Sequence, residues 1–337
     1  MDSKVKPPSS NDVAKLAGVS RTAVSRTFSN NGYVSTKTRE KVHKAAKSLG
    51  YRVNYLAKGL THLRSNLVGL VMADIDSPYR SQQIKSLSEK LLDNDFHPIL
   101  VPTSSDRDSS SVIELLMRYN VGGVIITSDT PPDSIYYECV AHQIPVVLIN
   151  KAEQNYKSDR VECNNQQGIE FIAETLTKLG CSQVAVISTH SNSYSISERT
   201  HRFLTYAKKI GLKTNTIYVD HHTYEMGNIA GNLLLETGTL PNGIFCTNDL
   251  LAIGVQDSLK QSLTSDELDA IPIIGFDDIP QANWSGNNIS TVRQSTEIMA
   301  RYVTDMLKKR QENPDIPPQS TMFDVELVLR GSLADKP

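Results

Sequence analysis

Four polar side chains that can bond to nucleic-acid bases fall on one face of a short predicted helix near the start of the chain: Arg21, Thr22, Ser25 and Arg26. The opposite face of this helix is mainly apolar. An arginine can bond bidentately to O6 and N7 of guanine, and a threonine can bond a base edge or touch a thymine methyl group. The pattern therefore favours base reading, although both arginines could instead bind phosphate alone.

Two short helices and a sharp turn must position these side chains. The first covers residues 11–18, ends at Gly18 and carries apolar residues at helical spacing: Val13, Leu16 and Ala17. Ser20 can cap the second helix through its hydroxyl group. A third helix, capped by Ser35, closes a small three-helix core. The sequence thus predicts a helix-turn-helix whose second helix enters the DNA major groove.

Charge is divided unevenly along the chain. The first 64 of the 337 residues hold 13 basic and 3 acidic residues, whereas the remainder holds 22 basic and 34 acidic residues. A basic module joined to an acidic body is expected where only one end of a protein meets a polyanion. On charge alone, a basic tail that merely aids solubility remains an alternative.

The string DVAKLAGVSRTAVSR, followed by YVSTKTREKV and LGYRVN, resembles the DNA-binding end of the lactose/galactose-repressor family of bacterial transcription regulators. The resemblance implies that Arg21, Thr22 and Arg26 contact operator bases. It places Ser20 and Ser25 near the phosphates. Double-stranded operator DNA of pseudo-palindromic sequence is then the expected partner of a homodimer.

The segment after this head is basic and carries a few large apolar residues, which is typical of a linker with weak helical character. The resemblance implies that it becomes a helix on the operator, with Asn54 and Leu60 among its DNA contacts. Leu60 matches a leucine that wedges open a base step in the minor groove. A packing contact with the body is the alternative for Leu60. Relatives commonly carry Pro where this chain has Val53, so the hinge is expected to start less rigidly.

From residue 66 the chain alternates short β-rich runs with helical patterns, which predicts parallel α/β sheets. Two consecutive sets of such units imply two lobes with a ligand cleft between them. The expected strands are 67–73, 98–103, 122–127, 145–150, 183–188, 216–220, 243–247 and 272–277.

This body resembles the effector core that the same family shares with periplasmic sugar-binding proteins, with crossings between lobes near residues 162–165, 291–294 and 322–325. Matching the family's binding positions gives these effector contacts: Arg199, Asn248, Asp249, Asp277 and Gln294. Further matched cleft positions are Asp76, Ser77, Tyr79, Thr127 and Asn150. These side chains suit a carbohydrate-like, polyhydroxylated small molecule. As alternatives, Asn248 could only cap its helix, and Asp277 could only cap or pair structurally.

One departure bears on the ligand. Relatives usually carry Gly three residues after the matched arginine, whereas this chain has Arg202 there. A cation beside the cleft would suit an anionic ligand such as a sugar phosphate or sugar acid. A site that has diverged to another ligand is the alternative.

Other classes of function have weaker support in the sequence. No phosphate-binding GxxxxGK[ST] loop, GxGxxG, GxSxG or HExxH motif occurs, so we expect no enzyme and no cofactor. The four cysteines are scattered, and His221 and His222 are expected to form a solvated loop rather than a metal site. The opening residues lack the apolar region of a signal peptide, so the expected location is cytoplasmic. A solute-binding protein of the same core fold is the alternative function, and it would need an export signal.

Together these features predict an all-α helix-turn-helix head followed by an α/β, two-lobed, periplasmic-binding-protein-like core with parallel sheets. The expected domains are a head over 1–51, a hinge over 52–65 and a core over 66–337. Within the core, lobe 1 is expected over about 66–163 and 294–323, and lobe 2 over about 164–293 and 324–333. The predicted function is that of an effector-controlled, sequence-specific transcriptional regulator, most simply a repressor.

Overall fold

The computed structural model describes residues 8–28, 33–52, 65–103, 109–127, 133–151, 158–190 and 193–333 of the chain. The chain divides into two compact units, residues 1–65 and 66–337, which are considered separately below. Asn54 and Leu60 lie outside the described residues, as does Val53. Their roles in the hinge therefore stay predictions.

The first unit is a bundle of three helices: α1 (Ser10–Ala17), α2 (Arg21–Thr27) and α3 (Thr36–Leu49). The hydroxyl of Ser20 accepts a hydrogen bond from the backbone of Ala23 at 3.1 Å, so it caps α2 as predicted. The hydroxyl of Ser35 caps α3 in the same way. Gly18 ends α1 in the left-handed region, at φ 64°, where a side chain would be strained.

The core of this bundle differs from the predicted one at one position. Val13 is fully buried, but Leu16 is 56% exposed. The residue that packs inward beside Val13 is Ala14, together with Val24 of α2 and Val42 of α3. The prediction for Leu16 was wrong because the face of α1 that packs on the core is formed by Val13, Ala14 and Ala17, and Leu16 lies outside it.

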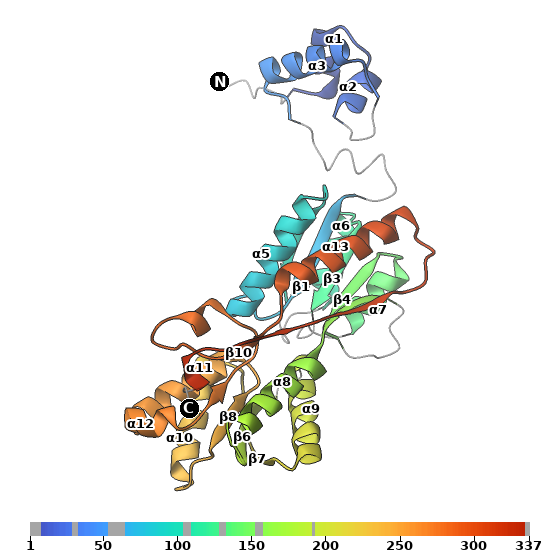
Figure 1. The fold of residues 1–337 in the computed structure, drawn as a ribbon. Coiled ribbons are helices and arrows are strands. Elements are labelled where there is room, and N and C mark those ends of the chain that lie inside the picture. Colours follow the sequence, from blue (N-terminus) through green and yellow to red (C-terminus); the bar gives the residue numbers. More distant parts are fainter. Residues whose placement is uncertain are drawn as a thin grey trace. The chain divides into compact units, whose positions relative to one another are not determined.

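The second unit contains two parallel sheets (Figure 1). The first has the strand order β11-β5-β4-β3-β1-β2, and every neighbouring pair is parallel. Its strands are β1 (Leu67–Met72), β2 (His97–Pro102), β3 (Gly123–Thr127), β4 (Val146–Ile149), β5 (Asp159–Cys163) and β11 (Ser320–Phe323).

Helices cover both faces of this first sheet, as a buried parallel sheet requires. Successive residues of β1 point to opposite sides: Leu70 packs with the helices α5 and α13, and Val71 packs with α6 and α7. The bounds are α5 (Pro78–Leu92), α6 (Ser109–Arg118), α7 (Ser134–Ala141) and α13 (Thr296–Glu312). We call this layered body lobe 1.

Lobe 2 is built around the second sheet, whose order is β7-β6-β8-β9 and whose neighbouring pairs are again parallel. Its strands are β6 (Gln183–Thr189), β7 (Lys213–Val219), β8 (Gly243–Cys246) and β9 (Ile273–Ile274). One face packs with α8 (Asn165–Lys178) and α9 (Tyr194–Ile210). The other packs with α10 (Tyr224–Glu236) and α11 (Asp249–Lys260), and the short α12 (Ser265–Asp269) follows α11.

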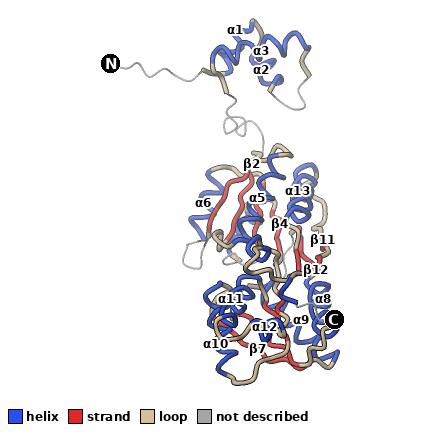
Figure 2. Tube along the Cα trace, turned by 60° about the vertical axis from the view of Figure 1, so that its left-hand side comes forward, coloured by secondary structure: helices blue, strands red, loops and turns tan. Residues whose placement is uncertain are grey.

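The chain passes between the lobes after Cys163, after Arg293 and after Phe323. An antiparallel pair accompanies two of these passages, formed by β10 (Thr291–Arg293) and β12 (Glu326–Val328). Two short 3-10 helices, η1 (Pro280–Asn283) and η2 (Gly331–Leu333), complete the described fold. Figure 2 shows the two lobes joined through this region.

Parallel α/β architecture was predicted correctly, and seven of the eight predicted strands lie within a few residues of their observed bounds. The eighth, predicted over 272–277, is only a two-residue strand, β9. Strands β5, β10, β11 and β12 were not predicted, because they are short segments with little apolar patterning. Among the described residues, no helix is both long and apolar enough to cross a membrane.

Close packing of α10 on α11 depends on glycine. A Cβ atom on Gly254 would lie 2.1 Å from the carbonyl oxygen of Tyr224 and 2.6 Å from the backbone nitrogen of Asn228. We therefore expect Gly254→Ala to push the helices apart and to destabilise the core by about 1–3 kcal/mol. Urea unfolding would measure this. The matched control is Gly286→Ala, where a Cβ meets nothing within 4 Å and no loss is expected.

Candidate functional site

The base-reading candidates lie exposed on α2. Arg21, Thr22 and Arg26 are all exposed, whereas Val24 and Thr27 on the opposite face are buried in the head. Ser25 is exposed as well. This is the arrangement that a recognition helix requires, because its buried face fixes the helix and its polar face remains available to base edges.

A cavity opens between the lobes of the core, at the carboxyl ends of several strands. Its cavity volume is about 50 Å³. Seven of the ten predicted effector contacts line it: Ser77, Tyr79, Asn150, Arg199, Asn248, Asp277 and Gln294. The crossing after Arg293 contributes Gln294 to the cavity.

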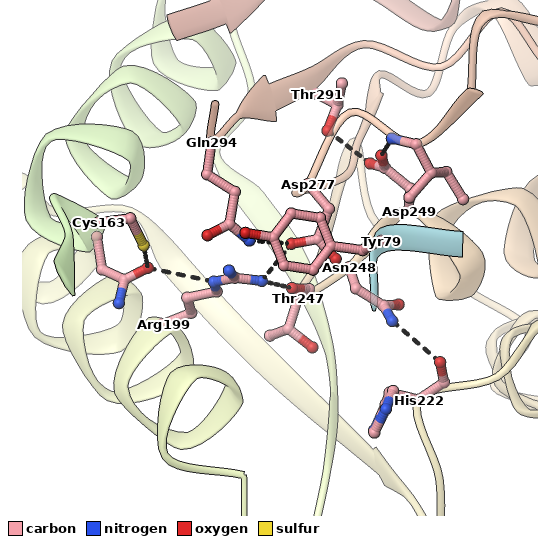
Figure 3. A network of polar contacts seen from close by, with 12 residues as sticks. Tyr79, Cys163, Arg199, His222, Thr247, Asn248, Asp249, Asp277, Thr291 and Gln294 are labelled. Atoms are coloured by element: carbon pink, nitrogen blue, oxygen red, sulfur yellow. Dashed lines mark hydrogen bonds and ion pairs between the residues drawn. The ribbon is translucent and has the colours of Figure 1, made fainter. Parts of the chain in front are cut away.

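Arg199 is the centre of a buried polar network (Figure 3). It projects from α9, and its Nη1 donates to Asp277 Oδ1 at 3.0 Å and to the carbonyl oxygen of Thr247 at 3.0 Å. Its Nε donates to Asn165 Oδ1 at 3.2 Å. The guanidinium also lies 3.7 Å from the centre of the Phe276 ring. Most of the hydrogen-bonding capacity of the Arg199 guanidinium is therefore used by other residues of the protein.

Asp277 is held in a strained backbone conformation, with φ 118°. Its Oδ1 accepts from Arg199 and, at 2.7 Å, from Nε2 of Gln294. Burial raises the pKa of Asp277, although Arg199 and Gln294 lower it. Burial likewise raises the pKa of the Tyr79 phenol well above its usual value, and Asp277 adds to the effect. Tyr79 is thus a neutral hydroxyl that can donate to a ligand.

Asn248 and Asp249 begin α11 but point to different places. Asn248 caps the helix, since its Oδ1 accepts from Leu251, and its Nδ2 donates to the carbonyl oxygen of His222 at 3.0 Å. It also lines the cavity. Asp249 does not line it. Its two carboxylate oxygens accept from Thr291 at 2.5 Å and from the backbone of Ile279 at 2.9 Å.

The structure thus corrects the expectation for Asp249, which is fully buried behind the cavity and joins α11 to the segment around Ile279. Two lobe 1 predictions are corrected too. Asp76 is exposed to solvent outside the cavity, because the chain turns at Asp74 (φ 49°) and brings Asp74 to the cavity instead. Thr127, at the end of β3, is fully buried and does not reach the cavity.

Arg202 does not face the cavity either. It pairs with Glu198, one turn earlier on α9, at 2.7 Å, and donates to Gln166 of α8 at 3.0 Å. Its side chain lines a groove on the outside of lobe 2. Arg202 therefore gives no support for an anionic ligand. Glu198 balances the charge of Arg202, and Arg202 does not line the cavity.

Several cavity residues were missed by sequence reasoning: Asp74, Pro78, Arg80, Ser193, Ser195, Ile196, His222, Leu250 and Ile279. Three buried polar atoms of the cavity have no hydrogen-bond partner among the described residues: Ser195 Oγ, His222 Nδ1 and Gln294 Oε1. Unpaired buried polar atoms are costly, so their convergence indicates a polar ligand. His222 carried a usable signal, since it lies two residues after the end of the predicted strand 216–220.

Among the described residues, no group of three or more His, Cys, Asp or Glu side chains could hold a metal ion. His221 is exposed, and His222 turns into the cavity. The adjacent carboxylates Asp277 and Asp278 diverge, since Asp278 pairs with Arg293 and Arg330, each at 2.6 Å. They are therefore no two-carboxylate site.

Comparison with known proteins relates both parts of the chain to gene regulators. Residues 11–54 match the bacterial regulatory proteins of the lacI family, and residues 173–333 match a periplasmic binding protein-like domain. The ribose operon repressor of Lactococcus lactis subsp. lactis (strain IL1403) is 27% identical over 327 residues, covering 96% of this chain and 97% of the relative. The sucrose operon repressor of Pediococcus pentosaceus is 27% identical over 335 residues, covering 97% of this chain and 99% of the relative.

Solved structures agree on the fold. The lac repressor dimer bound to operator and the anti-inducer ONPF superposes with a TM-score of 0.85 at 22% identity, covering 97% of this chain and 99% of that chain. The complex of the transcriptional regulator CelR with cellobiose gives a TM-score of 0.72 at 24% identity, covering 96% of this chain and 99% of that chain. The similarity thus includes the head as well as the core, which disfavours a solute-binding protein built from the core alone.

Proposed function

We infer that the chain belongs to the lacI family of bacterial regulatory proteins and that it is a DNA-binding transcriptional repressor controlled by a small molecule. The observation that carries the inference is the presence, in one chain, of a recognition helix with exposed arginines and an interlobe cavity with unpaired polar atoms. The first suits operator DNA, and the second suits a metabolite.

On DNA, we assign Arg21 and Thr22 to base edges and Arg26 to a further base contact. Ser20 and Ser25 lie at the phosphates in this assignment, and Asn54 and Leu60 extend the contact into the minor groove. Two copies of the chain form a dimer and place two recognition helices in successive major grooves. The operator is then a pseudo-palindrome.

In the cavity, the effector lies between Tyr79 of lobe 1 and the Asp277–Gln294 pair of lobe 2. The positive charge of Arg199 is balanced by Asp277 at 3.0 Å, so this pair presents no net charge to a ligand. An uncharged ligand with several hydroxyl groups suits it best, since hydroxyls both donate to Gln294 Oε1 and accept from Ser195 Oγ. A sugar or sugar derivative has this chemistry.

Control of DNA binding follows from population shift. An effector that binds one arrangement of the lobes more tightly moves the dimer toward it, and a coupling of about 1–3 kcal/mol suffices for a useful switch. The protein acts on the chromosome, so we place it in the cytoplasm. It needs no catalytic step, and we assign it none.

Selection of binding sites from random duplex DNA tests this function. The full-length protein should enrich a pseudo-palindromic sequence, and the enrichment should change when a sugar from a panel of ribose, sucrose and cellobiose occupies the cavity. The same panel, tested by thermal shift, reports occupancy independently, because a ligand that binds only the native state raises its stability. Equal binding of all duplex sequences would contradict the proposal.

A further inference from the structure

One imidazole lies across the mouth of the cavity between the two lobes. His222 follows β7 in lobe 2, and its Nε2 lies 3.9 Å from Oδ2 of Asp74, which follows β1 in lobe 1. The separation is within the range of an ion pair but beyond that of a direct hydrogen bond. A small closing movement of the lobes would bring His222 Nε2 and Asp74 Oδ2 within direct hydrogen-bond distance.

The other nitrogen of the same ring faces the ligand site. His222 Nδ1 is buried among the cavity residues and has no hydrogen-bond partner among the described residues. The backbone of His222 is held in place by Asn248, whose Nδ2 donates to its carbonyl oxygen (Figure 3). The ring is therefore positioned by the protein, while Nδ1 is left for a ligand.

Among the described residues, the charged groups that line the cavity with this ring come from four elements. Asp74 belongs to the loop after β1, and Asp277 to the segment after β9. Burial raises the pKa of Asp277, and the charge of His222 is among the influences that lower it. Two cations of the cavity, Arg199 of α9 and Arg80 of α5, and the neutral phenol of Tyr79 complete the set. Asp277 neutralises Arg199 at 3.0 Å, and across the mouth the carboxylate of Asp74 lies 3.9 Å from Nε2 of His222.

We propose that His222 couples effector binding to proton uptake, its imidazolium donating from Nε2 to Asp74 of the opposite lobe and from Nδ1 to an oxygen of the effector. This inference rests on the proposed function. Only the imidazolium donates from both nitrogens at once. The effector excludes water from the cavity, which strengthens both charge-assisted bonds. We call the paired His222 and Asp74 the interlobe latch.

The direction of the pH dependence follows. An effector-bound state that holds a proton on His222 binds the effector more tightly at low pH than at high pH. One coupled proton changes a binding constant by at most about tenfold per pH unit. We expect affinity at about pH 6 to exceed that at about pH 8 by about threefold or more.

A double-mutant cycle on the full-length protein tests the latch without any ligand. The variants are His222→Gln, Asp74→Asn and their combination. Asparagine suits position 74 because it tolerates the left-handed backbone found there, φ 49°. At about pH 6 the two substitutions should be non-additive, with a coupling of about two- to fivefold in the unfolding equilibrium constant, and at about pH 8 they should be additive.

Calorimetric titration with ribose, sucrose and cellobiose tests the effector side. A sugar that binds should show the expected pH dependence in the natural protein and lose it in His222→Gln. His221→Gln is the matched control, because it removes the adjacent, exposed histidine and should keep the dependence.

The outcomes separate the two ideas. Additive substitutions at about pH 6 overturn the latch whether or not a sugar binds, and so does an unchanged pH dependence in His222→Gln. A coupled cycle with no binding of any panel sugar supports the latch and contradicts the sugar effector of the proposed function.

Discussion

Arg199→Ala is expected to lower the free energy of unfolding of the core by about 3–5 kcal/mol, because it leaves Asp277 as a buried, uncompensated carboxylate. The substitution also removes the donors to Asn165 and to the carbonyl oxygen of Thr247, and the cation over the Phe276 ring. For a unit of this size each kcal/mol corresponds to about 2–4 °C in Tm, so the loss is readily measured by thermal unfolding.

A second substitution separates lost charge balance from lost packing. If the uncompensated carboxylate is the main cost, Arg199→Ala combined with Asp277→Asn should be more stable than Arg199→Ala alone, because the buried charge is then gone. Greater instability of the double variant would instead show that the hydrogen bonds of Asp277 to Gln294 and its neighbours matter more.

Arg202→Ala is the matched control for Arg199→Ala. Both arginines project from α9 and both pair with a carboxylate, but the Arg202 side chain is 37% exposed and lies outside the cavity. Exposed pairs contribute little, about 0–1 kcal/mol. A panel sugar that raises Tm in the natural protein should still do so in Arg202→Ala and should lose its effect in Arg199→Ala, which disturbs Asp277.

Much of the architecture could be predicted because local signals agree with the fold. Ser20 and Ser35 cap the helices they were expected to cap, and Gly18 stands where a left-handed residue is needed. Alternating α and β patterns predicted two parallel sheets. The strands at the crossings between lobes were missed, because β5 pairs with the distant β11, and β10 pairs with the distant β12.

The candidate site was predictable as a location rather than as a set of contacts. Residues at strand ends were expected to converge, and Arg199, Asp277 and Gln294 do. Which of two neighbours faces the cavity depends on backbone angles that no spacing rule supplies. Asp74 replaces Asp76 because of a turn at φ 49°, and Asp249 is diverted by its bonds to Ile279 and Thr291.

The position of Arg202 on α9 explains why it does not line the cavity, contrary to the expectation. Arg199 and Arg202 are three residues apart on α9, close enough to share one side of a helix, yet they serve different surfaces. The carboxylate of Glu198 accepts a hydrogen bond from Arg202. The side chain of Asn165 donates to Glu198 and accepts from Arg199. The outer groove is thus linked to the cavity through Asn165, but Arg202, a cation of that groove, does not line the cavity.

Arg21→Ala is expected to change which operator sequences the protein prefers. A bidentate bond from an arginine to guanine is worth about 1–3 kcal/mol of discrimination, and a dimer makes the contact in both half-sites. Arg21 is exposed at the start of α2, outside the buried core that Val24 joins, so the substitution should leave the head folded. Site selection from random DNA should then show relaxed preference at one base pair of each half-site.

Lys44→Ala is the control that matches the lost charge. Lys44 is exposed on α3 and is not part of the recognition helix, so its removal should weaken binding to all sequences alike, if at all, and leave the selected sequence unchanged. The two variants would then differ in kind: one in sequence preference, the other in affinity and salt dependence. A uniform loss of affinity in Arg21→Ala, with the selected sequence unchanged, would assign Arg21 to phosphate, and base reading would fall to Thr22 and Arg26.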